Sequence, residues 1–206
     1  MSVLIAAFVV GDFRQAAAQG DGRVPQSVLD QAEVATRAMG QQVLQGNFRI
    51  TLERMYPRWK KRAAKKLQGG QVELARRLAE IPKEMARQGI SMLNYEVRKP
   101  TRAHEVVLLR GEDKEGQPIN MYLEWLVFVP TRAEYRVIDP KTRLPRKIET
   151  LGFQVAVNKK GTPDWYFIDG RNCSIADLRS FFPSLPRDQK LLGLPQVGGG
   201  EIRREP

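Results

Sequence analysis

Side chains that commonly act as nucleophiles, bases or metal ligands are scarce in this chain. Its one cysteine, Cys173, excludes an intrachain disulfide and a cysteine-based zinc cluster. Its one histidine, His104, excludes a multi-histidine metal site. His104 has no Ser or Cys motif to act on, and we expect Cys173 to be a small, semi-buried thiol rather than a nucleophile. The sequence therefore assigns no catalytic residue, and it indicates no metal and no cofactor.

Acid–base chemistry could also use a tyrosine and a carboxylate that lie close together. Tyr122 and Glu124 alternate along one strand-like segment, and Tyr95 and Glu96 lie near the first expected strand. An isomerase that transfers a proton can use a carboxylate base and a group that stabilises an oxyanion, such as a tyrosine. Tyr122 and Glu124 share the polar face of their segment, however, which favours a solvated sheet surface over a catalytic pair.

A basic region is the clearest chemical feature of the sequence. The 206 residues include 34 Lys or Arg against 23 Asp or Glu, a net charge of +11, and almost all of this excess lies in residues 47–110. Residues 54–66 contain seven basic residues and no acidic one. Five of the seven would share one face of a helix. These anion-facing candidates are Arg54, Arg58, Lys61, Arg62 and Lys65.

Two interpretations of this basic face are open. It fits an anionic surface or an acidic protein as a partner. It also fits a solvated helix face that only improves solubility. We do not expect nucleic acid as the partner, because no RNA- or DNA-binding motif accompanies the charge.

Apolar periodicity predicts three helices in the N-terminal half of the chain. The first covers residues 28–43 and ends at Gly46, a residue type that favours helix termination. The second covers residues 52–67, with a kink or break near its Pro57. The third covers residues 74–85.

From about residue 90 the apolar period becomes two, which predicts strands. The strongest alternation covers residues 119–129, and shorter strand-like runs cover residues 105–110, 151–157 and 165–168. The sequence therefore predicts an α+β fold: three N-terminal helices packed in a curved, mainly antiparallel sheet of five to six strands.

Four short motifs occur in an order that is informative about the fold. The first helix ends in QGNF, the next segment reads RMYPRW, Gly69 and Gly70 with Glu73 open the third helix, and the last strand reads DWYFIDG. Over residues 27–170 this order resembles the nuclear transport factor two-like superfamily, which includes the SnoaL-like and ketosteroid-isomerase-like proteins. The resemblance implies a cone-shaped fold with a pocket at its open end. It implies no reaction, because this fold hosts isomerases, cyclases, dehydratases and non-catalytic binding modules.

The same resemblance guides the choice of interior residues. Trp165 and Phe167 alternate with Tyr166 and Ile168 along the last strand, and we expect the first pair to face inward. We expect Phe153 and Val155 on the neighbouring strand to line the same interior. Core packing is the default for such side chains, and a ligand pocket is the additional prediction. The pocket candidates are Tyr56, Trp59, Trp125, Phe153, Val155, Trp165 and Phe167.

The two ends of the chain are predicted to lie outside the domain. Residues 1–18 contain an apolar run followed by three alanines, like the core and cleavage site of a signal peptide. They predict a periplasmic or secreted protein, but no basic residue precedes the run, which leaves a cytoplasmic protein as the alternative. The run is too short to cross a bilayer. We expect one domain over residues 19–182 and a mobile tail, rich in Pro and Gly, over residues 183–206.

Three functions follow, in order of preference. The first is a non-enzymatic, exported binding or scaffold protein with a small apolar pocket and a basic helical face. The second is an isomerase- or dehydratase-like enzyme that uses a pocket carboxylate. The third is an assembly protein that docks on an anionic surface. An acidic side chain in a closed apolar cavity would favour the enzyme, and the sequence leaves the oligomeric state open.

Overall fold

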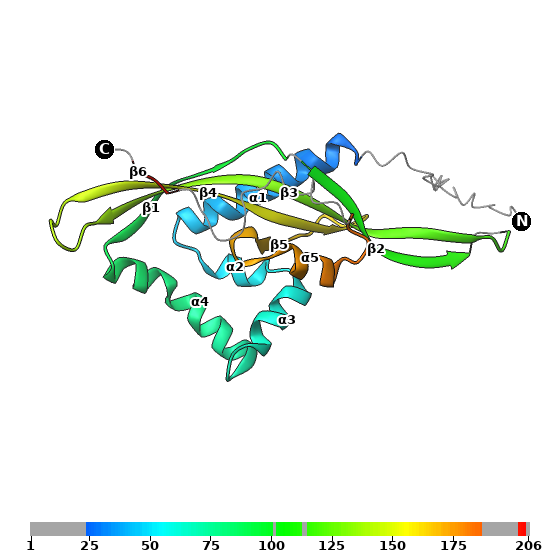
Figure 1. Cartoon of the computed structure of the whole chain (residues 1–206), viewed down its shortest axis with the longest axis horizontal. Coiled ribbons are helices and arrows are strands. Elements are labelled where there is room, and N and C mark those ends of the chain that lie inside the picture. Colours follow the sequence, from blue (N-terminus) through cyan, green and yellow to red (C-terminus); the bar gives the residue numbers. More distant parts are fainter. Residues whose placement is uncertain (1–23, 101, 113–114, 187–201, 205–206) are drawn as a thin grey trace, which may run out of the picture.

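The structure, a computed structural model, describes residues 24–100, 102–112 and 115–186, and the backbone of residues 202–204. Within these residues four helices precede a sheet, and a fifth helix follows its main strands (Figure 1). The α+β class is therefore confirmed. The predicted signal peptide, on which the predicted location depends, lies outside the described residues.

The N-terminal helices number four in the described residues, not the predicted three, because the second predicted helix is divided. Pro57 is the first residue of α3, where its fixed φ suits a helix start and its missing N–H costs nothing. Gly69 and Gly70 connect α3 to α4 with φ of +100° and +60°, a left-handed turn that glycine adopts readily. The helices are α1 (Gln26–Leu44), α2 (Arg49–Glu53), α3 (Pro57–Lys65) and α4 (Gly70–Arg87).

The sheet of the described residues is open and antiparallel, with one long strand at its centre. Strand β3 pairs with β4 along most of its length, with β2 near its start and with β1 near its end. Strands β5 and β6 pair with β4. The predicted cone shape is not confirmed. The strands are β1 (Ile90–Val97), β2 (Arg102–Glu112), β3 (Pro118–Ile138), β4 (Pro145–Lys159), β5 (Trp165–Asp169) and β6 (Ile202–Arg204).

Both faces of the central sheet are covered, so the strands carry buried side chains on both sides. Helix α1 packs on one face, against a cluster that includes Val127 and Trp165. Helix α5 (Ile175–Phe181) packs on the opposite face, in a cluster that includes Phe128 and Ile168. Over residues 126–129, β3 is therefore buried on both faces rather than half-buried, as a strand between two layers must be.

This two-sided packing overturns one prediction about the interior. Phe153 and Val155 were expected to share a face with Trp165 and Phe167. The register pairs Val155 with Ile168, and cross-strand partners point to the same face. Phe153 and Val155 accordingly belong to the α5 cluster, whereas Trp165 and Phe167 belong to the α1 cluster.

The folded core continues past the predicted domain boundary at residue 182. Leu185 is buried in the α5 cluster. Helix α5 begins with a capping box in which the Ser174 hydroxyl accepts a hydrogen bond from the backbone of Asp177 and the Asp177 carboxylate accepts one from the backbone of Ser174. Residues 202–204 pair with β4 at Ile148–Thr150. The rest of the predicted tail lies outside the described residues.

Candidate functional site

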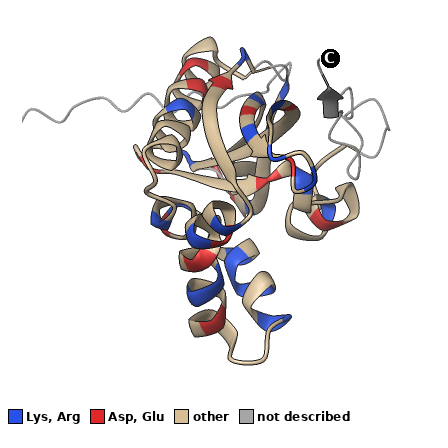
Figure 2. Cartoon of the chain, turned by 90° about the vertical axis from the view of Figure 1, so that its left-hand side faces the viewer, with Lys and Arg blue, Asp and Glu red and all other residues tan. Residues whose placement is uncertain are grey.

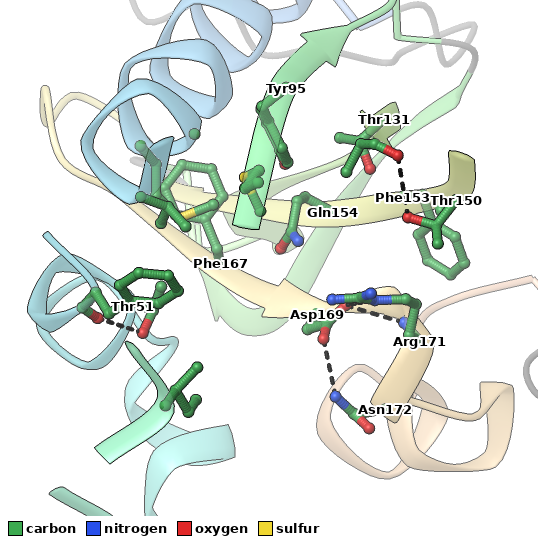
Figure 3. Close-up of a pocket in the computed structure, with 18 of the residues that line it drawn as sticks. Thr51, Tyr95, Thr131, Thr150, Phe153, Gln154, Phe167, Asp169, Arg171 and Asn172 are labelled. Carbon is green, nitrogen blue, oxygen red and sulfur yellow. Dashed lines mark hydrogen bonds and ion pairs between the residues drawn. The ribbon is translucent and has the colours of Figure 1, made fainter. Parts of the chain in front are cut away.

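A cavity of about 400 Å³ lies on the α1 face of the sheet, beside the packed cluster. Helices α1, α2, α3 and α4 contribute to its walls, and strands β1, β3, β4 and β5 form its floor (Figure 3). Four of the six methionines of the chain line it: Met39, Met55, Met85 and Met92. Methionine side chains are flexible and polarisable, so they adapt to an apolar ligand of variable shape.

The cavity depends on a close approach between α1 and β1. A Cβ atom on Gly40 would lie 2.1 Å from the Tyr95 ring, so only glycine lets the ring lie against the helix. A similar close contact occurs just after β5, where a Cβ atom on Gly170 would lie 2.4 Å from the Phe153 ring. Neither glycine stands out in the sequence, because each contact joins residues far apart in the chain.

Polar side chains gather at the β5 end of the cavity, where Tyr95, Thr131, Gln154, Asp169 and Arg171 line it. The Asp169 carboxylate caps the short helix η1 (Gly170–Asn172), accepting a hydrogen bond from the backbone N–H of Arg171 at 3.1 Å. It also accepts one from the Asn172 amide at 2.8 Å. Asp169 is thus a carboxylate inside the cavity, but its oxygens are already bonded to the protein.

The structure brings together three of the seven predicted pocket residues. Phe167 and Trp59 line the cavity, and Phe153 borders it from the opposite face of the sheet. Val155 does not line it, because its side chain is buried on that opposite face. Trp165 is buried deeper in the α1 cluster, away from the cavity.

The other two predicted pocket residues are held elsewhere by polar contacts. The Lys160 ammonium lies 4.0 Å from the centre of the Trp125 ring, a cation–π contact. The Tyr56 hydroxyl donates a hydrogen bond of 3.0 Å to Glu124. Burial raises the pKa of Tyr56 above its usual range, and the Glu124 charge adds to the effect, so the hydroxyl stays protonated. Glu124 therefore forms a structural pair with Tyr56, outside the cavity.

The two rare side chains singled out by composition do not line the cavity either. Cys173 is 1% exposed, and burial raises its thiol pKa to about 12, so it is protonated and unreactive near neutral pH. The His104 ring lies edge-on to Phe128, with 6.2 Å between ring centres. Both side chains contribute to packing.

The basic face is smaller than predicted, because three of its five residues bind the protein itself. Arg54 forms an ion pair of 3.0 Å with Asp164. Arg58 donates a hydrogen bond of 2.7 Å to the backbone carbonyl of Phe181 in α5. Arg62 forms an ion pair of 2.6 Å with Asp177. Arg58 and Arg62 anchor α3 to α5, and Arg54, at the end of α2, binds the loop before β5. Helical periodicity could not distinguish these roles from an anion-facing one.

The available positive charge lies on the outer side of α3. Within the described residues Lys61 and Lys65 are exposed and form no ion pair, and neither does their neighbour Lys60. Helices α3 and α4 project together from the rest of the molecule and carry many Lys and Arg residues (Figure 2). On α4 the Glu73 carboxylate accepts hydrogen bonds from Arg76 and Arg77, so part of that charge is neutralised.

We expect the α3 lysines to dominate binding to anionic surfaces. Replacing Lys60, Lys61 and Lys65 by Gln should reduce retention on heparin and on anionic vesicles. The difference should shrink as salt rises, because the screening length falls from about 10 Å at 0.1 M to about 3 Å at 1 M. The control replaces three other exposed lysines, Lys99, Lys141 and Lys159, by Gln. Equal losses in both triple variants would show that only the overall charge matters.

The chain has no significant match among protein-family models, curated proteins or solved structures. The resemblance to the nuclear transport factor two-like superfamily is therefore still a prediction. Among the described residues, no helix has both the length and the apolar character that crossing a membrane requires.

Proposed function

We propose that this protein is a non-enzymatic binding protein whose cavity on the α1 face takes a small apolar ligand. The methionine-lined cavity carries the proposal, since its volume of about 400 Å³ is within the range of small-molecule sites. Leu78, Ile81 and Met85 present the apolar side of α4 to this space. Apolar side chains beside a cavity lose packing contacts, and an apolar ligand would restore them.

The chemistry of the cavity supports binding over an isomerase or dehydratase. The carboxylate that lines it, Asp169, accepts hydrogen bonds from its own helix turn and is not presented as a base. The best tyrosine–carboxylate pair, Tyr56 and Glu124, lies outside the cavity. The α3 lysines support docking on an anionic surface as a second property of the same protein.

A neutral apolar dye tests the proposal. We expect N-phenyl-1-naphthylamine to bind the protein at one saturable site, with increased dye fluorescence. Ile81→Trp should weaken this binding at least tenfold, because the larger ring would occupy the cavity. The control is Val72→Trp, on the same helix at a position that is 80% exposed, which should bind like the original protein.

Two results would contradict the proposal. One is the absence of saturable binding to the folded original protein. The other is an equal effect of Ile81→Trp and Val72→Trp, which would place the dye outside the cavity. Circular dichroism of each variant confirms that the helices are intact.

A further inference from the structure

The polar end of the cavity contains a tyrosine hydroxyl in need of a partner. Tyr95 Oη is buried, and although Thr131 lies near enough to affect its pKa, no described residue forms a hydrogen bond of good geometry with it. Burial raises the pKa of Tyr95 to about 12, so the group is a protonated donor near neutral pH. Buried polar groups are nearly always hydrogen-bonded in folded proteins, and an unpaired one calls for an explanation.

An amide faces the same space. Gln154 projects from β4 into the cavity near Tyr95 (Figure 3). Within the described residues its side chain has no hydrogen bond, although it is only partly exposed. Gln154 alternates with Phe153 and Val155 along β4, so its side chain lies on the other face of the sheet. The structure places it on the cavity floor, because α1 covers that face of the sheet.

Arg171 contributes a positively charged guanidinium group whose two terminal nitrogens can bind a ligand. Its Cγ would lie 3.6 Å from a Cβ on Gly152, so the arginine chain lies across β4 at that glycine. Its Nε is 3.5 Å from Asp169 Oδ1, a weak contact. Within the described residues neither terminal nitrogen has a hydrogen bond of good geometry, although Tyr135 lies near enough to affect the pKa of Arg171. Paired terminal N–H groups match the two oxygens of a carboxylate.

These three groups converge from separate elements. Tyr95 comes from β1, Gln154 from β4 and Arg171 from η1, and all three line one end of the cavity (Figure 3). All three can donate hydrogen bonds, and the carboxylate beside them, Asp169, is already bonded by its own helix turn. The four methionines line the same cavity. The cavity therefore combines an apolar lining with a group of hydrogen-bond donors.

We infer that the ligand is an amphipathic carboxylic acid, whose carboxylate binds Arg171, Gln154 and Tyr95 and whose apolar chain extends among the methionines. This inference rests on the proposed function, since it names the ligand class of the same cavity. Asp169 offsets part of the Arg171 charge, so a neutral head group that only accepts hydrogen bonds is the competing outcome of the test.

Two probes with the same chain separate a carboxylate from a neutral head group. Decanoate and decanol are titrated into the full chain at pH 7.5, each in competition with N-phenyl-1-naphthylamine. We expect decanoate to bind about tenfold more tightly than decanol, the scale of a charge-assisted hydrogen-bonded pair. Arg171→Gln should remove this preference and leave decanol binding unchanged.

The control is Arg110→Gln, which removes one positive charge from an exposed position on β2, outside the cavity. It should preserve the preference for decanoate. Equal binding of both probes by the original protein, or an equal effect of Arg171→Gln and Arg110→Gln, would overturn the carboxylate assignment while the dye result still supports an apolar site. Failure of the dye to bind would overturn the proposed function and this inference together.

Discussion

Truncation of Phe167 to alanine is expected to lower the free energy of unfolding by about 3–5 kcal/mol, the usual cost of removing a packed aromatic ring. Phe167 is 5% exposed and belongs to the cluster beneath α1. Its backbone also joins β5 to the segment before α3: its N–H donates to the carbonyl of Arg54 at 2.7 Å, and its carbonyl accepts from Tyr56 at 2.9 Å. Those backbone bonds stay in the variant, so the loss reports the side chain.

Urea unfolding followed by tryptophan fluorescence measures this loss. Phe167→Leu is the matched variant, since it keeps much of the apolar volume and should cost clearly less. A loss below about 1 kcal/mol for Phe167→Ala would contradict the packing described for this ring, because even modest core truncations usually cost that much.

Replacement of Gly40 by alanine is expected to destabilise the protein by about 1–3 kcal/mol, as overpacking does. Helix propensity alone predicts the opposite sign, since alanine is favoured over glycine by about 0.8–1.0 kcal/mol within a helix. The structure decides between them, because the new Cβ would lie 2.1 Å from the Tyr95 ring. The prediction therefore concerns the sign of the change in the free energy of unfolding as well as its size.

A double-mutant cycle isolates the cause of this effect. In a Tyr95→Ala background the obstructing ring is absent, so Gly40→Ala should become neutral or stabilising. Chemical unfolding of the four proteins gives the two free-energy differences. If Gly40→Ala costs the same with and without the Tyr95 ring, the close approach of α1 and β1 is not its cause.

The elements of the fold were largely predictable from the sequence, because apolar periodicity and Pro and Gly signals are local. The break at Pro57 and the change from helices to strands near residue 90 are examples. What the sequence could not supply is how layers stack on the sheet. A period-two pattern shows that Phe153 and Ile168 alternate with other residues, but the register that places them on one face is set by long-range pairing.

The candidate site was less predictable than the fold, for the same reason. Phe167 and Trp59 were expected from their aromatic character, and both line the cavity. Tyr95, Gln154 and Arg171 were not expected as a group, since they come from three separate elements. Tertiary contacts also determine which basic residues of α3 are available to a partner. Arg62 forms an ion pair with Asp177, whereas Lys61 forms no ion pair within the described residues.

The sparse packing of helix α4 bears on how a ligand enters the cavity. Of its side chains only Leu74 is buried, while the apolar side that includes Ile81 lies against the cavity. Detaching α4 therefore exposes little packed surface, and its opening free energy should be well below that of global unfolding. A ligand that fills the cavity stabilises the closed state by mass action, in proportion to the logarithm of its concentration above its Kd. The occupied and empty proteins would then differ mainly in the hydrogen-exchange protection of one helix, while the sheet stays closed throughout.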